Sequence, residues 1–272
     1  MKANKLKEIW SKGGCALNGW LSIPSAFSAE IMAAQGYDSI GIDLQHGIVD
    51  YQEAVGMLQA MRASDVTPLV RPAWLDPVHI MKALDAGAYG VICPMINGRA
   101  EAERLVSYVR YPPAGIRSYG PSRALISSGG GNYLGEADEE IVCFAMIETA
   151  EALDKLEEIA TTPGLDGIYI GPADLTIGLT GKKYAPGFDR EEPEVIEAID
   201  RILKASHSAG IKAALHCGSA GYAARAAKWG FDLVTVSNDV RLLAGAVAAS
   251  ITSFRSIMTE RENASGNTKG GY

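Results

Sequence analysis

Two acidic residues stand where apolar runs of strand length come to an end. Glu148 closes the run 141–148, and Asp174 follows the run 167–171 after a Gly-Pro step. In a parallel sheet, catalytic and binding residues lie at the carboxyl ends of the strands, so both carboxylates are expected at the same end of the sheet. Two carboxylates completed by substrate and water oxygens suit Mg²⁺ or Mn²⁺, whereas zinc is disfavoured because no Cys or His recurs at ligand spacing. The alternative is that both acids cap helices.

The turn before Asp174 is Gly171-Pro172-Ala173. Proline is favoured at the first position of a helix, where free N–H groups and the helix dipole attract an anion. The sequence therefore predicts a place for an anionic group beside the two acids.

Further polar residues follow other predicted strands: Asp43, Gln45, His46, Arg71 and His216. Arg71 could hold a keto oxygen or an enolate, because a guanidinium stays charged, or it could form an ion pair with a neighbouring acid. His46 could serve as a general base, because histidine titrates near neutral pH, or it could be an ordinary hydrogen-bonded residue. For any one of these residues, a turn or capping role is the competing interpretation.

An orienting partner for His46 could be Asp43 or Asp85. Asp85 precedes a predicted helix end, where an acid is slightly unfavourable, so a partner for it is expected. Chemistry through a Schiff-base lysine is the competing route to the same kind of intermediate. No lysine stands at the carboxyl end of a predicted strand, which favours the metal route.

Eight apolar runs alternate with helical patterns and must position these residues. The predicted strands are 16–23, 39–45, 68–73, 90–95, 141–148, 167–171, 213–216 and 233–237. The predicted helices are 28–35, 51–62, 76–87, 99–108, 150–161, 193–209, 219–229 and 239–259. This alternation predicts an α/β fold, a single (β/α)₈ TIM barrel. A doubly wound open sheet is the second choice, since residues 23–27 carry no glycine fingerprint after the first strand.

One connection, 110–140, is too long and too rich in turn residues for an ordinary link. Long loops in compact domains are often lids or binding loops, so this segment is expected over the barrel mouth.

Composition limits the class of protein. The 272 residues, 47% of them hydrophobic, suit one barrel domain over residues 1–260, and 261–272 reads as a disordered polar tail. The net charge of -7 is modest and basic residues are scattered, so neither nucleic acid nor a membrane surface is expected as a partner. Four widely spaced cysteines, no signal-peptide core and no apolar run of membrane-spanning length predict a cytoplasmic protein.

From Trp20 to about Val247 the chain resembles the HpcH/HpaI aldolases, the class II pyruvate aldolases. Within that family its motifs are most similar to those of the hydroxyketoacid aldolases. The segments that carry the resemblance are IDLQHG (42–47), LVRP (69–72), DAGA (85–88), RYPPAGIR (110–117), MIET (146–149) and GPADL (171–175). Many family members have Glu at the position of Gln45 and Gln at that of Met146, so polar contacts near the metal differ here.

The resemblance implies a barrel with a domain-swapped C-terminal helix, assembled as trimers or hexamers. It also implies that Glu148 and Asp174 hold Mg²⁺, Mn²⁺ or Co²⁺. A 2-oxoacid would chelate that metal, with its carboxylate against the backbone of Gly171, Pro172 and Ala173.

Further roles follow from the same resemblance. Arg71 would stabilise the enolate, and His46 with Asp85 would move the proton. Asp43 and Arg123 match positions that approach the site of a neighbouring subunit. Trp20 and Gln45 are assigned to the substrate site.

The function expected from the sequence is reversible aldol addition and cleavage between a 2-oxoacid, pyruvate or hydroxypyruvate, and an aldehyde. One alternative is an acyl-CoA lyase of the citrate lyase β-subunit type, which would need a basic groove for the CoA phosphates, and no such patch is evident. The other is a barrel that binds a carboxylate without turning it over.

Overall fold

Eight parallel strands close into a barrel in sequence order, in a computed structural model that describes residues 1–266. The strands are β1 (Ala16–Leu21), β2 (Ser39–Asp43), β3 (Thr67–Arg71), β4 (Gly90–Cys93), β5 (Val142–Ile147), β6 (Gly167–Ile170), β7 (Lys212–Cys217) and β8 (Leu233–Val236). β8 pairs with β1 and closes the ring. The predicted (β/α)₈ barrel and all eight predicted strands are therefore confirmed, and the open sheet is excluded.

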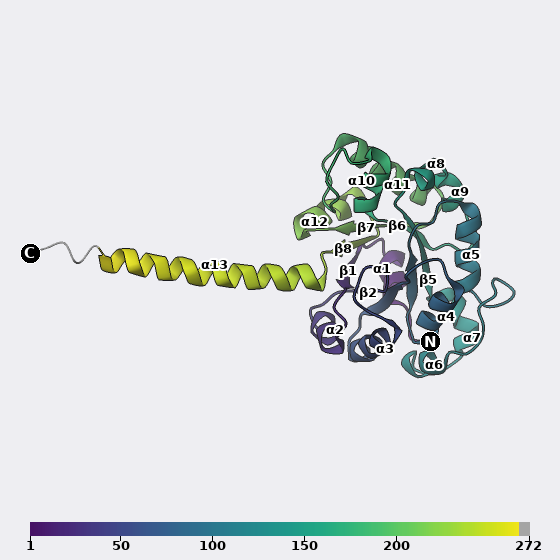
Figure 1. The fold of residues 1–272 in the computed structure, drawn as a ribbon. Coiled ribbons are helices and arrows are strands. Elements are labelled where there is room, and N and C mark those ends of the chain that lie inside the picture. Colours follow the sequence, from purple (N-terminus) through teal and green to yellow (C-terminus); the bar gives the residue numbers. More distant parts are fainter. Residues whose placement is uncertain (267–272) are drawn as a thin grey trace, which may run out of the picture.

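The chain also forms helices, most of which cover the outside of the barrel (Figure 1). They are α1 (Lys5–Ser11), α2 (Ala26–Ala33), α3 (Tyr51–Ala60), the 3₁₀ turn η1 (Met61–Ala63), α4 (Pro77–Asp85), α5 (Arg99–Val109), α6 (Ser122–Ser127), α7 (Tyr133–Glu140), α8 (Ala150–Asp154), α9 (Leu156–Ala160), α10 (Pro172–Thr180), α11 (Pro193–Ser208), α12 (Ala220–Trp229) and α13 (Asp239–Gly266). The cap predicted for α4 is present: Asp76 accepts hydrogen bonds from two backbone N–H groups of the first turn, and Pro77 occupies the first position.

Alternate residues of each strand face the barrel interior. Leu69, Phe144, Tyr169 and Ala214 belong to one buried cluster inside the barrel, whereas their neighbours along the chain pack outward under the helices. This alternation fixes which residue at the end of each strand faces the mouth.

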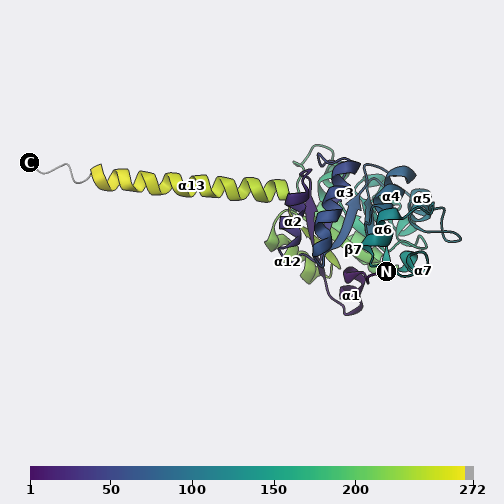
Figure 2. The same ribbon diagram turned by 90° about the horizontal axis from the view of Figure 1, so that it is seen from below.

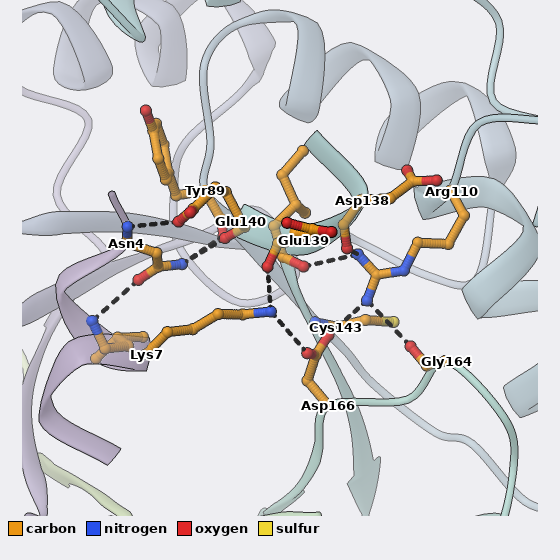
Figure 3. A network of polar contacts seen from close by, with 12 residues as sticks. Asn4, Lys7, Tyr89, Arg110, Asp138, Glu139, Glu140, Cys143, Gly164 and Asp166 are labelled. Carbon is orange, nitrogen blue, oxygen red and sulfur yellow. Dashed lines mark hydrogen bonds and ion pairs between the residues drawn. The ribbon is translucent and has the colours of Figure 1, made fainter. Parts of the chain in front are cut away.

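The amino-terminal end of the barrel is closed by α1 and a polar network. Leu6 and Trp10 of α1 join the interior cluster. Figure 3 shows Asn4 bonded to Glu140 and Tyr89, and Arg110 bonded to Asp166 with an Nη2–Oδ2 distance of 2.6 Å. These bonds join the chain start to the strand starts, so this end of the barrel is structural.

The segment 110–140 does not cover the mouth, and that expectation is wrong. The segment contains α6 and α7, and it contacts the first residues of the chain through Lys2 N–Ser128 O (2.8 Å) and Asn4 N–Glu140 Oε2 (2.6 Å). It therefore lies towards the amino-terminal end of the barrel. Buried Arg117, which pairs with Asp85 at the end of α4, holds it there.

α13 leaves the barrel after β8 and projects away from it (Figures 1 and 2). Its first residue is fixed, since the Asp239 carboxylate accepts hydrogen bonds from the N–H groups of Ser22 (2.9 Å) and Ile23 (3.1 Å). Every residue from 240 to 260 is exposed. By length and composition alone, residues 239–260 form a helix that could cross a membrane. This corrects the expectation that no apolar run reaches membrane-spanning length. A helix that packs on another protein has the same length and composition.

α13 continues to Gly266, past residue 260, where the sequence predicts the end of the barrel domain. Residues 267–272 of the predicted tail lie outside the described residues.

Candidate active site

The strand registers bring several polar residues to one level at the mouth. Ile147, Ile170 and Leu215 are paired across β5, β6 and β7, so the residues that follow them, Glu148, Gly171 and His216, also stand side by side. On the other side of the ring, Asp43 of β2 is paired with Arg71 of β3. These positions have the interior orientation, so all of them face the mouth.

The Glu148 carboxylate is buried, 2% exposed, and lacks a basic partner at ion-pair distance among the described residues. Its Oε1 atom accepts a hydrogen bond from the Met95 N–H at 2.8 Å. Burial, helped by the charge of nearby Asp174, raises the pKa of Glu148 to about 7. The hydrogen bond from Met95 and the charge of Arg71 oppose this rise only in part. Asp174 is exposed in the first turn of α10.

This donor set fits a hard divalent cation. Two neighbouring carboxylates, one buried with a raised pKa, would both be stabilised by positive charge between them. Among the described residues, no third His, Cys, Asp or Glu joins them in a group of metal ligands. A bound cation would thus keep positions for substrate and water, as Mg²⁺ usually does.

The β6–α10 turn forms the third side of this corner. A Cβ added at Gly171 would lie 2.4 Å from Glu148 Oε2, so only glycine lets the backbone approach the carboxylate so closely. Pro172 is the first residue of α10, and the N–H groups of Ala173 and Asp174 have no partner among the described residues. Free N–H groups are thus present at the helix start where the sequence predicts a place for an anionic group.

Arg71 and Asp43 form a bidentate ion pair, with Nε–Oδ1 at 2.8 Å and Nη2–Oδ2 at 2.5 Å. Burial alone would raise the pKa of Asp43, but the hydrogen bonds and charge of Arg71 hold it below its usual range. Trp20 lies beneath the pair, 5.0 Å from the guanidinium carbon, and its Nε1 donates to Asp43. The ion pair that the sequence offered as one role for Arg71 is thus present, while Nη1 has no bond in the described residues and remains available to a ligand.

Gln45 and His46 follow on the loop after β2. Asp43 Oδ1 accepts hydrogen bonds from both of their backbone N–H groups, at 3.0 and 3.1 Å. The Gln45 side-chain oxygen is buried without a partner in the described residues, which fits a binding role. His46 is exposed, and among the described residues only its backbone N–H, not its ring, makes a hydrogen bond.

Two predicted residues are not brought to this site within the chain. Asp85 ends α4, and helix ends lie at the opposite side of the barrel from strand ends, so it cannot orient His46 of its own chain. It pairs instead with Arg117 at 2.9 Å. Arg123 of α6 contacts the Ala86 carbonyl oxygen and lies in the same region.

Sequence reasoning missed two features. Met95 has a φ of 56°, unusual for a side chain of its kind, and this conformation aims its N–H at Glu148. No signal in the sequence identifies it, because any residue supplies an N–H. The second feature is a hydrogen bond between Tyr169 and His216, which the alternation of β6 and β7 could have indicated.

The sequence matches the model of the family described as HpcH/HpaI aldolase/citrate lyase over residues 18–246. A hydroxypyruvate/pyruvate aldolase of Rhizorhabdus wittichii is 43% identical over 93% of this chain and 100% of its own length. A 4-hydroxy-2-oxo-heptane-1,7-dioate aldolase of Salmonella heidelberg is 34% identical over 92% of this chain and 94% of its own. The crystal structure of a HpcH/HpaI aldolase/citrate lyase family protein from Burkholderia cenocepacia superposes with a TM-score of 0.85 at 31% identity, over 93% of this chain and 100% of that one.

Proposed function

From the premise that this chain belongs to the HpcH/HpaI aldolase/citrate lyase family and is an aldolase, a carbon–carbon lyase, we propose how it acts. It joins and cleaves a 2-oxoacid, pyruvate or hydroxypyruvate, and an aldehyde with a divalent cation, Mg²⁺, Mn²⁺ or Co²⁺, held by Glu148 and Asp174. The observation that carries this proposal is the buried Glu148 carboxylate, which has a raised pKa and an acidic neighbour.

A cation at this corner would draw electrons from the keto group and make the C3 proton of the 2-oxoacid acidic. The N–H groups of Ala173 and Asp174 would receive the substrate carboxylate, and the Gln45 side chain would contact the same substrate. Removing one C3 proton leaves an enolate whose charge develops on the former keto oxygen.

Arg71 would bind that oxygen through Nη1. Because Asp43 holds the other edge of the guanidinium and Trp20 supports it, the donor is already oriented before charge develops. His46, exposed at the rim with no bond to its ring in the described residues, would accept the C3 proton.

Aldolase activity is favoured over acyl-CoA cleavage because the relatives that match most of this chain are named aldolases. Their names also disfavour a barrel that binds a carboxylate without turnover.

For the assembly, we propose that α13 packs on a second copy, in a trimer or hexamer. A groove of about 440 Å³ lies on the outside of the barrel, lined by residues such as Leu17, Ala223, Val234 and Val236. It lies beside β8, where the helix that follows the last strand of a barrel ordinarily packs, while α13 of the same chain points away. Val247 and Ile251 of α13 are exposed and supply the matching apolar surface.

The same assembly would bring Arg123 and Asp85 of one copy to the mouth of another. Both lie outside the mouth of their own chain. A cytoplasmic location remains part of this proposal.

Cleavage of 4-hydroxy-2-oxoacids, read as pyruvate release in a coupled assay, tests the function. EDTA should abolish release and Mg²⁺ or Mn²⁺ should restore it. Glu148→Gln should lose release, whereas the matched control Glu151→Gln, an exposed residue paired with Lys155, should keep it. Full release after complete metal removal would contradict the proposal.

A further inference from the structure

A chain of hydrogen bonds runs through the inside of the barrel from β2 to β7. Ser39 Oγ donates to Asn18 Oδ1 at 2.7 Å, and Asn18 Nδ2 donates to Thr235 Oγ1 at 2.9 Å. Thr235 Oγ1 lies 2.6 Å from Tyr169 OH, which lies 2.9 Å from His216 Nδ1. All five residues are buried, the first four of them completely.

The order of donors along this chain fixes the tautomer of His216. Thr235 Oγ1 already accepts from Asn18, so its own proton is left for Tyr169 OH, whose proton then goes to His216 Nδ1. The reverse order would leave the Thr235 hydroxyl proton without an acceptor among the described residues. Since Nδ1 accepts, the neutral ring carries its proton on Nε2.

The Nε2–H group of His216 is buried, and no described residue accepts a hydrogen bond from it. Burial, together with the charge of Arg71 and against the charge of Asp43, lowers the pKa of His216 to about 3, so the ring stays neutral at physiological pH. A buried donor without an acceptor lowers stability, so its presence at a mouth points to a ligand.

The position of the ring says which part of a ligand it meets. His216 stands level with Glu148, two strands away, which corresponds to roughly 10 Å. It lies between Trp20, with ring centroids 5.1 Å apart, and Phe188, which stacks on it at 4.5 Å. The donor is therefore held between two aromatic rings, away from Glu148 and Asp174, which would hold the cation.

We propose that His216 Nε2–H donates a hydrogen bond to a hydroxyl oxygen on C3 of the 2-oxoacid, so that the site prefers a hydroxypyruvate-type substrate to pyruvate. The proposal deepens the proposed function and rests on it. With its carboxylate at the N–H groups of Ala173 and Asp174 and its keto oxygen at the cation, the 2-oxoacid would extend its C3 substituent towards β7. A 2-oxoacid without the hydroxyl leaves the donor unpaired, and a site built for a hydroxyl discriminates on that basis.

The test is the ratio of kcat/KM for hydroxypyruvate to kcat/KM for pyruvate, measured with one aldehyde at saturation. His216→Phe keeps an aromatic ring between Trp20 and Phe188 but removes the donor, and the ratio should fall about tenfold. Tyr169→Phe frees Nδ1 and unfixes the tautomer, so the ratio should fall by less. Tyr89→Phe is the matched control, because the Tyr89 hydroxyl has no partner in the described residues, and it should leave the ratio unchanged.

Nitrogen NMR of the wild-type protein without substrate gives an independent result. An Nε2–H tautomer at His216 supports the proposal, and an Nδ1–H tautomer overturns it even if His216→Phe fails to fold. Equal loss of kcat/KM for both 2-oxoacids would also overturn it, since the donor would then serve the aldehyde or the fold. A wild-type protein inactive with both refutes the proposed function itself, and the inference with it.

Discussion

The pKa values of two buried carboxylates at the barrel mouth are shifted in opposite directions. Asp43 is buried with Arg71, whose hydrogen bonds and charge outweigh burial and keep the pKa of Asp43 low. Burial prevails at Glu148 and raises its pKa to about 7, helped by the charge of Asp174. The protein therefore neutralises one acid internally and leaves the other for a cation from outside.

This difference predicts how the stability of the metal-free protein depends on pH. Glu148 titrates near 4.5 when unfolded and near 7 when folded, so between these values the folded state binds the extra proton. The free energy of unfolding should thus fall as pH rises from about 5 to 7.5, by up to about 3 kcal/mol. Urea denaturation at fixed protein concentration measures this slope.

Glu148→Gln should remove that slope, and Mg²⁺ should restore stability to the wild-type protein at pH 7.5. Glu151→Gln serves as control, because its carboxylate is exposed. An unchanged slope in Glu148→Gln would show that another group is responsible.

For individual residues, the sequence predicted which side chains lie at the mouth better than it predicted which side chains they contact. Strand ends placed Asp43, Arg71 and Glu148 at the mouth, because alternation along a strand is regular. The choice of Arg71 as the partner of Asp43 depends on the register between β2 and β3, which the sequence does not display. Asp85 does not reach His46 of its own chain, and the sequence could not show this, because the position of a residue on a helix does not reveal which end of the barrel it faces until the fold is known.

Among the elements, the β6–α10 junction controls the site most tightly. Gly171 lets the backbone lie against Glu148, and Pro172 starts a helix whose free N–H groups face the same corner. A strand, a turn and a helix start therefore act on one carboxylate.

Gly171→Ala should damage this corner without unfolding the barrel. The added methyl group would stand 2.4 Å from Glu148 Oε2 and displace it, so affinity for the cation and kcat/KM should each fall about 10- to 100-fold. Calorimetric titration with Mn²⁺ and the cleavage assay measure both. Gly221→Ala on α12 is the control, with nothing within 4 Å of its Cβ, and should raise helix stability by up to about 1 kcal/mol.

Equal cation affinity in Gly171→Ala and wild type would show that the close approach has no functional role.

The strands of this junction were predictable from their apolar runs. The short helices α6 and α7 were not, because helices of this length depend on tertiary contacts such as Asn4–Glu140.

The whole molecule consists of a closed barrel and a helix that does not cover it. Leu243, Val247, Ile251, Phe254 and Met258 are exposed and lie three or four residues apart, so they form one apolar stripe along α13. A stripe of this kind needs a covering surface, and the groove beside β8 is the proposed one.

Val247→Glu should therefore weaken the assembly. Sedimentation of the wild type should give a mass of three or six chains of 28.8 kDa, and the variant should give smaller species. Ser256→Glu, on the opposite side of α13, should sediment as the wild type does. A monomeric wild type would contradict the proposed packing.

The most direct test of the central claim is proton exchange at C3 of pyruvate in D₂O without any aldehyde, followed by proton NMR. The wild-type protein with Mg²⁺ should exchange the C3 protons, lose this activity on chelation and regain it when Mg²⁺ returns. Exchange that persists after complete metal removal, or no exchange with any divalent cation, would contradict the account.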